Sequence, residues 1–297
     1  MNSRSFLRFL LFILAALPLR AQLDVTLQIE RSNYVAWEPL FATVTVTNTS
    51  GNDFVLGGPN NAPWLNFLIT GDGNRPATAL APVEADALMC RRGQTLQRRF
   101  NLPRHYHLTQ SGTYVVRASV YFPDLQRWIQ SRPSRVSIAQ APRPKWEQAF
   151  ALPAGHRLAG KYRRYQVFNF HDVDRSYLYV RVIDESTGLF LATYRLSSIV
   201  PDQDVQPAVD RAMNLHLLCL GGPQTWAYHT VDVDGKLTHQ EFLKQDKGLP
   251  KLITQPSGQV YVAGGTSYDP LKPAPTAATA TDKIRRLTDR PPGVQLR

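Results

Sequence analysis

The sequence of 297 residues contains only two cysteines, Cys90 and Cys219. We predict that they belong to different domains, so a disulfide would have to cross between the domains, and we expect two free thiols. Cys219 lies in the apolar stretch Leu217–Leu220 and is predicted to be a small buried hydrophobic residue. Neither cysteine has the neighbours that activate a thiol nucleophile.

After the N-terminus, the sequence has no apolar run long enough to cross a bilayer. The N-terminal run, Phe9–Leu17, is also far shorter than the ~20 residues of a spanning helix, which disfavours a single-pass anchor. It follows Arg4 and Arg8 and precedes the small residue Ala21, as in a secretory signal. We therefore expect residues 1–21 to be a cleaved signal peptide and the mature chain to be secreted or periplasmic. We expect no transmembrane segment after cleavage. We also expect no lipid anchor, because no cysteine follows directly after the predicted cleavage site.

Acidic residues are fewer than basic ones, and the formal net charge is +11. Removing Arg4, Arg8 and Arg20 with the signal leaves +8. No run reaches the five or six basic residues that mark a nucleic-acid patch. Export also argues against nucleic acid, so we expect a solvated basic surface and a protein or glycan partner in the envelope or outside the cell.

The motifs of several enzyme classes are missing. No G-x-S-x-G nucleophile elbow occurs. His105 and His107 form a pair without a third metal ligand nearby, and His171 beside Asp172 and Asp174 has the same deficiency. Paired carboxylates of a glycosidase depend on spatial separation, so the sequence leaves that alternative open. We predict no catalytic and no cofactor-binding residues.

Regular alternation of apolar and polar residues is the strongest pattern present. Period two over short segments predicts strands that are buried on one face. Clusters rich in Gly, Asn, Ser and Asp separate the segments and predict turns. About seven short strands with this spacing are typical of an immunoglobulin-like (Ig-like) sandwich. The alternating segments are residues 23–30, 42–47, 65–69, 100–102, 114–120 and 136–138.

A family resemblance rests on the order of four sequence features in this region. They are Glu38-Pro39, Val46–Ser50, Arg92–Leu102 and Ser111–Ala118. This order resembles the Ig-like and macroglobulin-type β-sandwich domains of bacterial exported proteins, over residues 22–140. The resemblance implies that Tyr114 is a corner tyrosine. The paired core cysteines of antibody domains are absent, and the resemblance implies a fold without indicating a function.

The C-terminal half is predicted to be a second β-rich domain. Residues 141–146 contain two prolines and are predicted to be a linker. In the domain at 147–269, Pro207–Gly222 aligns without gaps on Pro250–Gly265 at an offset of 43 residues. This period resembles β-propeller blades, but only two or three copies fit, so we favour a β-meander over a propeller-like repeat domain. Residues 270–297 are predicted to be a disordered basic tail.

One segment resembles an EF-hand calcium loop. If it is numbered from Thr230, Asp232, Asp234 and Glu241 occupy ligand positions three, five and twelve, and Gly235 the turn position six. Thr230 itself lacks the carboxylate expected at position one, and the entering segment is poor in helix formers. The alternative is a β-hairpin with a type I′ turn at Asp234-Gly235, which we favour. Calcium remains the minority possibility for a cofactor.

Aromatic residues near a predicted hairpin tip form the remaining candidate site. Tyr121, Phe122 and Trp128 are a possible contact surface, but core or interdomain packing is the interpretation that we favour. The sequence as a whole predicts an all-β, exported, non-catalytic protein for binding, adhesion or envelope accessory roles, with an unidentified ligand. The alternative is a carbohydrate-active enzyme whose carboxylates assemble in the C-terminal domain.

Overall fold

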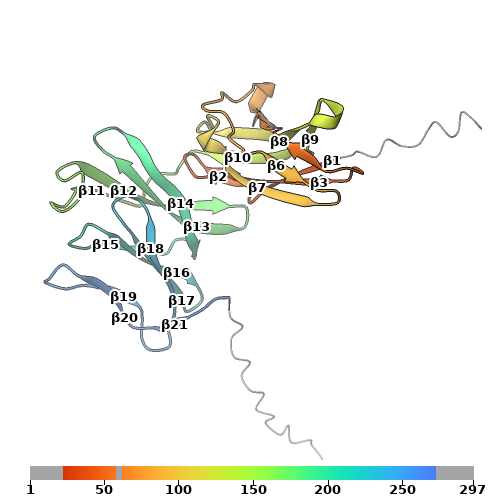
Figure 1. The fold of residues 1–297 in the computed structure, drawn as a ribbon. Helices are drawn as coiled ribbons and strands as arrows, with labels where there is room; N and C mark the ends of the chain where they lie inside the picture. Colours follow the sequence, from red (N-terminus) through yellow and green to blue (C-terminus); the bar gives the residue numbers. More distant parts are fainter. Residues whose placement is uncertain (1–22, 58–61, 272–297) are drawn as a thin grey trace, which may run out of the picture. The chain divides into compact units, whose positions relative to one another are not determined.

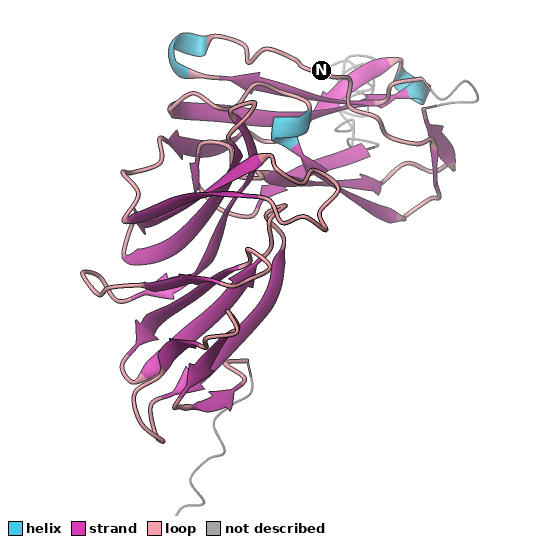
Figure 2. Cartoon of the chain, turned by 90° about the vertical axis from the view of Figure 1, so that its left-hand side faces the viewer, coloured by secondary structure: helices cyan, strands magenta, loops and turns pink. Residues whose placement is uncertain are grey.

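The computed structural model describes residues 23–57 and 62–271, and within them the chain is all-β. Its strands are joined by turns and three short 3-10 segments (Figures 1 and 2). The predicted signal peptide and nearly all of the predicted tail lie outside the described residues. Among the described residues, no helix has the length and apolarity to cross a membrane.

Two sheets and a small hairpin form the N-terminal region. Neighbouring strands pair antiparallel, except for β2 and β10, which are parallel. The first sheet has the order β1 (Leu23–Ile29), β3 (Phe41–Asn48), β7 (Thr95–Asn101). The second has the order β2 (Asn33–Val35), β10 (Ser134–Ala139), β8 (Gly112–Phe122), β5 (Leu65–Thr70), with β9 (Arg127–Gln130) also on β8. The hairpin pairs β4 (Phe54–Leu56) with β6 (Leu88–Cys90).

The two sheets share one hydrophobic core, which makes this region a β-sandwich. On β3, Ala42, Val44 and Val46 are buried and the intervening threonines are less so, as the period-two pattern predicts. Val116 and Val120 on β8 belong to the same core cluster. The alternation therefore directs one face of each sheet into a common interior.

A third sheet follows, and it belongs to the same compact unit as the sandwich. Its order is β11 (Trp146–Ala151), β12 (Tyr162–Asp172), β13 (Arg175–Asp184), β14 (Leu189–Ile199). The first unit contains the described residues up to Ser198 together with Asp232–Lys236. The sequence predicted a linker at 141–146, whereas the compact units divide after Ser198. One physical reason is a set of polar contacts from β13 to the sandwich, including Tyr179 to Glu38 at 3.3 Å.

The second unit contains a β-meander, because β15, β16, β17 and β18 pair consecutively and antiparallel. The sheet has the order β15 (Gln206–Val209), β16 (Leu215–Gly222), β17 (Thr225–Val231), β18 (Leu237–Lys244), β21 (Thr266–Tyr268). A separate hairpin pairs β19 (Lys251–Thr254) with β20 (Val260–Ala263).

The two copies of the sequence repeat both form hairpins, but their registers differ. Pro207 pairs with Leu217 in the first copy. The equivalent partner in the second copy, Val260, pairs instead with Thr254. The similarity therefore extends to strand order and not to the pairing of individual residues.

Candidate functional site

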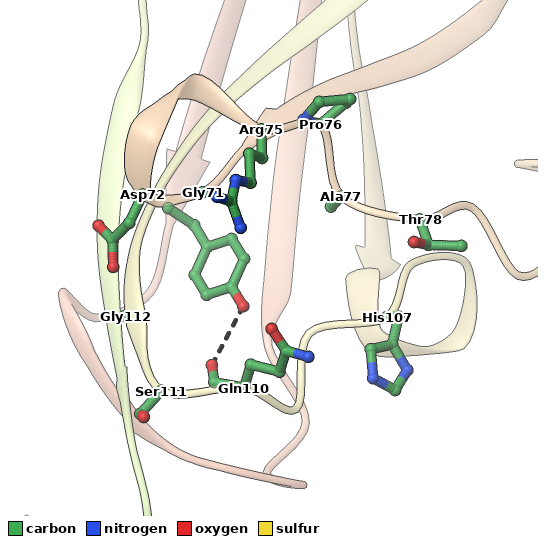
Figure 3. Close-up of a pocket in the computed structure, with 11 residues that line it drawn as sticks. Gly71, Asp72, Arg75, Pro76, Ala77, Thr78, His107, Gln110, Ser111 and Gly112 are labelled. Atoms are coloured by element: carbon green, nitrogen blue, oxygen red, sulfur yellow. Dashed lines mark hydrogen bonds between the residues drawn. The ribbon is translucent and has the colours of Figure 1, made fainter.

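A cavity of about 220 Å³ opens beside the end of β5 and the start of β8 in the sandwich (Figure 3). Two segments far apart in the sequence line it, and they meet because β5 pairs with β8. The lining residues are Gly71, Asp72, Arg75, Pro76, Ala77, Thr78, His107, Gln110, Ser111, Gly112 and Tyr114.

Turn chemistry after β5 builds the first wall of the pocket. The amide of Gly71 donates to the carbonyl of Arg75 at 2.8 Å, and Ala77 donates to Ile69 at 2.8 Å, so the chain folds back on itself. On the opposite side, Gly112 has a φ of +151°, and a Cβ there would lie 2.6 Å from Oδ2 of Asp72. The positive φ therefore favours glycine where the two walls approach each other, and any larger residue would also displace the Asp72 carboxylate.

Tyr114 forms a third wall and ties the two ends of its own segment together. Its hydroxyl donates to the backbone carbonyl of Gln110, four residues upstream, at 3.1 Å. Burial, and secondarily the charge of Asp72, raise the pKa of Tyr114. The phenol is therefore a fixed, neutral wall of the pocket, with its proton committed to the backbone.

The polar side chains around the cavity are available to a ligand. Among the described residues, the guanidinium of Arg75 has no ion-pair or hydrogen-bond partner, and the side chains of Thr78 and Gln110 make no hydrogen bond. In Figure 3, Arg75 and Gln110 extend into the space between the two walls. The Asp72 carboxylate points away from Gln110. The cavity is thus lined by one cation, Arg75, by one carboxylate, Asp72, and by neutral donors and acceptors.

The candidate calcium loop is the tip of a hairpin, because β17 and β18 flank it as paired strands. The turn differs from the predicted type I′. Only Gly235 has positive φ, at +85°, and its amide donates to the carbonyl of Asp232 at 3.0 Å. The Asp232 carboxylate accepts the amides of Asp234 and Lys236 at 3.0 and 2.8 Å, which closes the turn. Asp232 therefore has a structural role in the hairpin.

Basic groups surround the Asp234 carboxylate, which the calcium loop would need as a ligand. Its oxygens lie 3.6 Å from His156, 3.8 Å from Arg157 and 4.0 Å from Arg163. Glu241 lies on β18 and contacts His239 at 3.6 Å. No group of three metal-ligating side chains occurs in the described part of the chain. The structure thus does not bring Asp232, Asp234 and Glu241 together as a ligand set.

The histidines considered as metal ligands make other contacts. His105 lies 2.9 Å from the carbonyl of Pro82, and His107 lies 2.9 Å from the hydroxyl of Thr109. His171 contacts the Ser176 hydroxyl at 3.2 Å. Of these three, only His107 lines the cavity.

The predicted aromatic surface is divided between the two faces of its sheet. Tyr121 and Trp128 are paired neighbours on β8 and β9 and form an edge-to-face contact, with ring centroids 5.5 Å apart. Trp128 is 46% exposed. Phe122 is completely buried against Phe54 in the sandwich core, so its ring takes no part in an exposed surface.

Sequence reasoning did not single out Trp37, whose backbone has a φ of +74°. A bulky residue is uncommon in that conformation and has a conformational cost. Its indole remains 45% exposed and stacks on Phe190 at 4.7 Å. In the structure, Trp37 occupies a turn position that normally takes glycine, and nothing in the sequence around Glu38-Pro39 marks it.

The second unit contains a chain of hydrogen bonds that sequence reasoning also missed. Oδ2 of Asp210 lies 3.2 Å from Nε2 of His216, whose Nδ1 lies 2.7 Å from the hydroxyl of Tyr228. Burial raises the pKa of Asp210, but hydrogen bonds from Asn214 and His216 outweigh burial and lower it overall. Tyr228 is mostly buried and also contacts Thr230 at 3.3 Å, so the chain satisfies its own polar groups.

Comparison with known proteins gives little information on this chain. No protein-family model and no curated protein matches it. Among solved structures, it is similar to the sporulation control protein Spo0M from Bacillus subtilis. The identity is 12% and the TM-score 0.29, over 60% of this chain and 91% of that one.

Proposed function

We propose that this protein is an exported, non-catalytic binding protein, used for adhesion or as an accessory of the envelope. Its ligand is a small hydroxylated unit, such as one sugar of a glycan, held in the sandwich pocket. One observation carries the proposal. The cavity between 71–78 and 107–114 is lined by Arg75, Thr78 and Gln110, whose side-chain polar groups have no partner within the described residues. Convergent polar groups in a concave site are the usual features of ligand binding.

The Ig-like resemblance supports the same proposal. Tyr114 makes the backbone hydrogen bond of a corner tyrosine, and the pocket lies at the turns that join strands of the sandwich. Loops on a rigid β-scaffold are a common location for binding residues. The scaffold would then hold the loops, and the loops would hold the ligand.

Filling the cavity tests the proposal. Gln110→Trp places a large ring at the pocket wall, and Gln97→Trp, on an exposed position of β7, is the matched control. On a panel of immobilised glycans, we expect wild-type protein and Gln97→Trp to bind and Gln110→Trp to lose binding. Equal binding by all three proteins would contradict the pocket as the site. Release of sugar products would favour the carbohydrate-active enzyme.

A further inference from the structure

Arg75 gives the pocket a charge preference. Among the eleven lining residues, Arg75 and Asp72 are the groups that carry formal charge at neutral pH. The Asp72 carboxylate packs against Gly112, accepts the Thr113 amide at 3.4 Å and points away from Gln110 (Figure 3). Arg75 has no counter-ion among the described residues. The Asp72 carboxylate is therefore occupied by its own turn, and the guanidinium of Arg75 is the group that would attract an anion.

The neutral lining residues indicate what else the ligand must carry. Thr78 and Ser111 offer hydroxyls, and Gln110 offers an amide with both a donor and an acceptor. The Tyr114 ring forms an apolar wall beside them, which suits the C–H face of a sugar ring. The cavity volume of about 220 Å³ is smaller than the roughly 300–1,000 Å³ of pockets that hold drug-sized ligands. The cavity thus admits one compact unit and not an extended chain.

We infer that the pocket recognises the carboxylate of a single uronic acid unit in an acidic glycan. This inference rests on the proposed function, whose ligand class it narrows. Arg75 would bind the carboxylate through a planar, two-pronged contact, which guanidinium groups form readily. Thr78, Gln110 and Ser111 would bind the ring hydroxyls. The net charge of +8 that remains without Arg4, Arg8 and Arg20 would favour the approach of a polyanionic glycan at low ionic strength.

Calorimetric or NMR titration of the protein with glucuronate, glucose and acetate tests the inference. Arg75→Gln removes the cation, and Arg98→Gln makes the same charge change on an exposed position of β7. We expect glucuronate to bind at least tenfold more tightly than glucose or acetate. Arg75→Gln should abolish that difference, and Arg98→Gln should preserve it. The melting temperature of each variant shows whether it remains folded.

The outcomes separate this inference from the proposed function. If glucose and glucuronate bind equally and Gln110→Trp blocks both, the pocket is the site but the uronate inference is wrong. If no sugar binds and Gln110→Trp changes nothing, the proposed function fails as well. A third arm uses a blocked aspartate amide, which carries a carboxylate without ring hydroxyls. If this compound binds more tightly than glucuronate, the inference of a glycan ligand is wrong and an acidic peptide is the better ligand class.

Discussion

Arg181 donates a hydrogen bond of 2.9 Å to the carbonyl oxygen of Ala36, although 145 residues separate the two in sequence. The guanidinium also lies over the ring of Phe190, at 4.7 Å from its centroid. Burial lowers the pKa of Arg181 to about 10, so the group remains charged at neutral pH. Its contact with Ala36 holds a turn of the sandwich, Val35–Glu38, in which the Glu38 amide donates to the Val35 carbonyl at 3.0 Å.

Replacing Trp37 in this turn separates its backbone strain from its stacking. Trp37→Ala and Trp37→Gly both lose the contact with Phe190, but only glycine adopts a φ of +74° without steric cost. We therefore expect the glycine variant to be more stable than the alanine variant by ~1 kcal/mol. Urea unfolding of the two variants measures the difference. Equal stabilities would mean that the turn relaxes to another conformation.

Glu38 is a second contact point of the same turn, and it is 4% exposed. Its carboxylate accepts hydrogen bonds from Arg31 at 2.5 Å and from the Val35 amide at 3.1 Å. Glu38→Gln keeps the shape but removes the charge that faces Arg31, so we expect a loss of ~2 kcal/mol in unfolding free energy. The control is Glu30→Gln, in which an exposed pair with Arg99 is broken. That change should cost less than ~1 kcal/mol, and a similar loss in both variants would contradict the argument.

Gly235 at the hairpin tip combines positive φ with a close approach. A Cβ there would lie 2.4 Å from the Cβ of Ala192. Gly248 has a similar φ of +92° but no atom within 4 Å of the same position, so Gly248→Ala measures strain alone. We expect Gly235→Ala to be at least ~1 kcal/mol less stable than Gly248→Ala, because overpacking adds to the strain. Chemical denaturation of the two variants gives the comparison, and matching losses would show that Ala192 moves aside freely.

Calcium is predicted to leave the melting temperature of the protein unchanged. Asp232 accepts backbone amides of its own turn, and Asp234 faces His156 and Arg157. A true site would raise the melting temperature by mass action as calcium is added. The test is a pair of calorimetric scans, one with about 1 mM calcium, roughly a thousandfold above a micromolar Kd, and one with a chelator. A rise with calcium that Glu241→Gln removes would establish an EF-hand-like loop.

The sequence pattern predicted the strands of the sandwich well because period two directly reports one-sided burial. The same alternation explains the position of Phe122. Even-numbered side chains of β8 such as Tyr114 and Val116 are buried, and Phe122 lies on that same face. Counting along the strand would have placed it in the core. The aromatic character of Tyr121-Phe122 left both a contact surface and core packing open, and alternation is the more direct physical signal.

The pocket could not be predicted in the same way. Its walls come from residues 71–78 and 107–114, which meet only because of the register between β5 and β8. Gly71–Asn74 and Gln110–Gly112 are two of the clusters whose composition predicts turns, but nothing in the sequence places them side by side. The positive φ of Trp37 was equally hidden, because contacts from β13 and β14 hold a conformation that local propensity disfavours.

The second unit is predicted to lose stability in mild acid through His229. This side chain is completely buried, and burial, with a smaller contribution from His239, lowers its pKa from 6.5 to about 4. The folded state therefore resists protonation, whereas the unfolded chain accepts a proton below pH 6.5. The unfolding free energy should be at its plateau above pH 6.5 and fall as the pH drops toward 4. The unfolding free energy should fall by ~3 kcal/mol in total, because each unit of pKa shift corresponds to about 1.4 kcal/mol.

The measurement is urea unfolding at pH 7.5, 5.5 and 4.5 for the wild type, His229→Gln and His171→Gln. His229→Gln removes the titrating group, so its stability should vary less with pH, whatever the absolute cost of the substitution. His171 is exposed on β12, so His171→Gln should keep the wild-type dependence. Asp210 adds a separate loss of unfolding free energy in acid. Because its pKa is lowered in the folded state, that loss occurs only at pH below about 4. If the unfolding free energy of His229→Gln depends on pH as steeply as that of the wild type, another group causes the acid sensitivity.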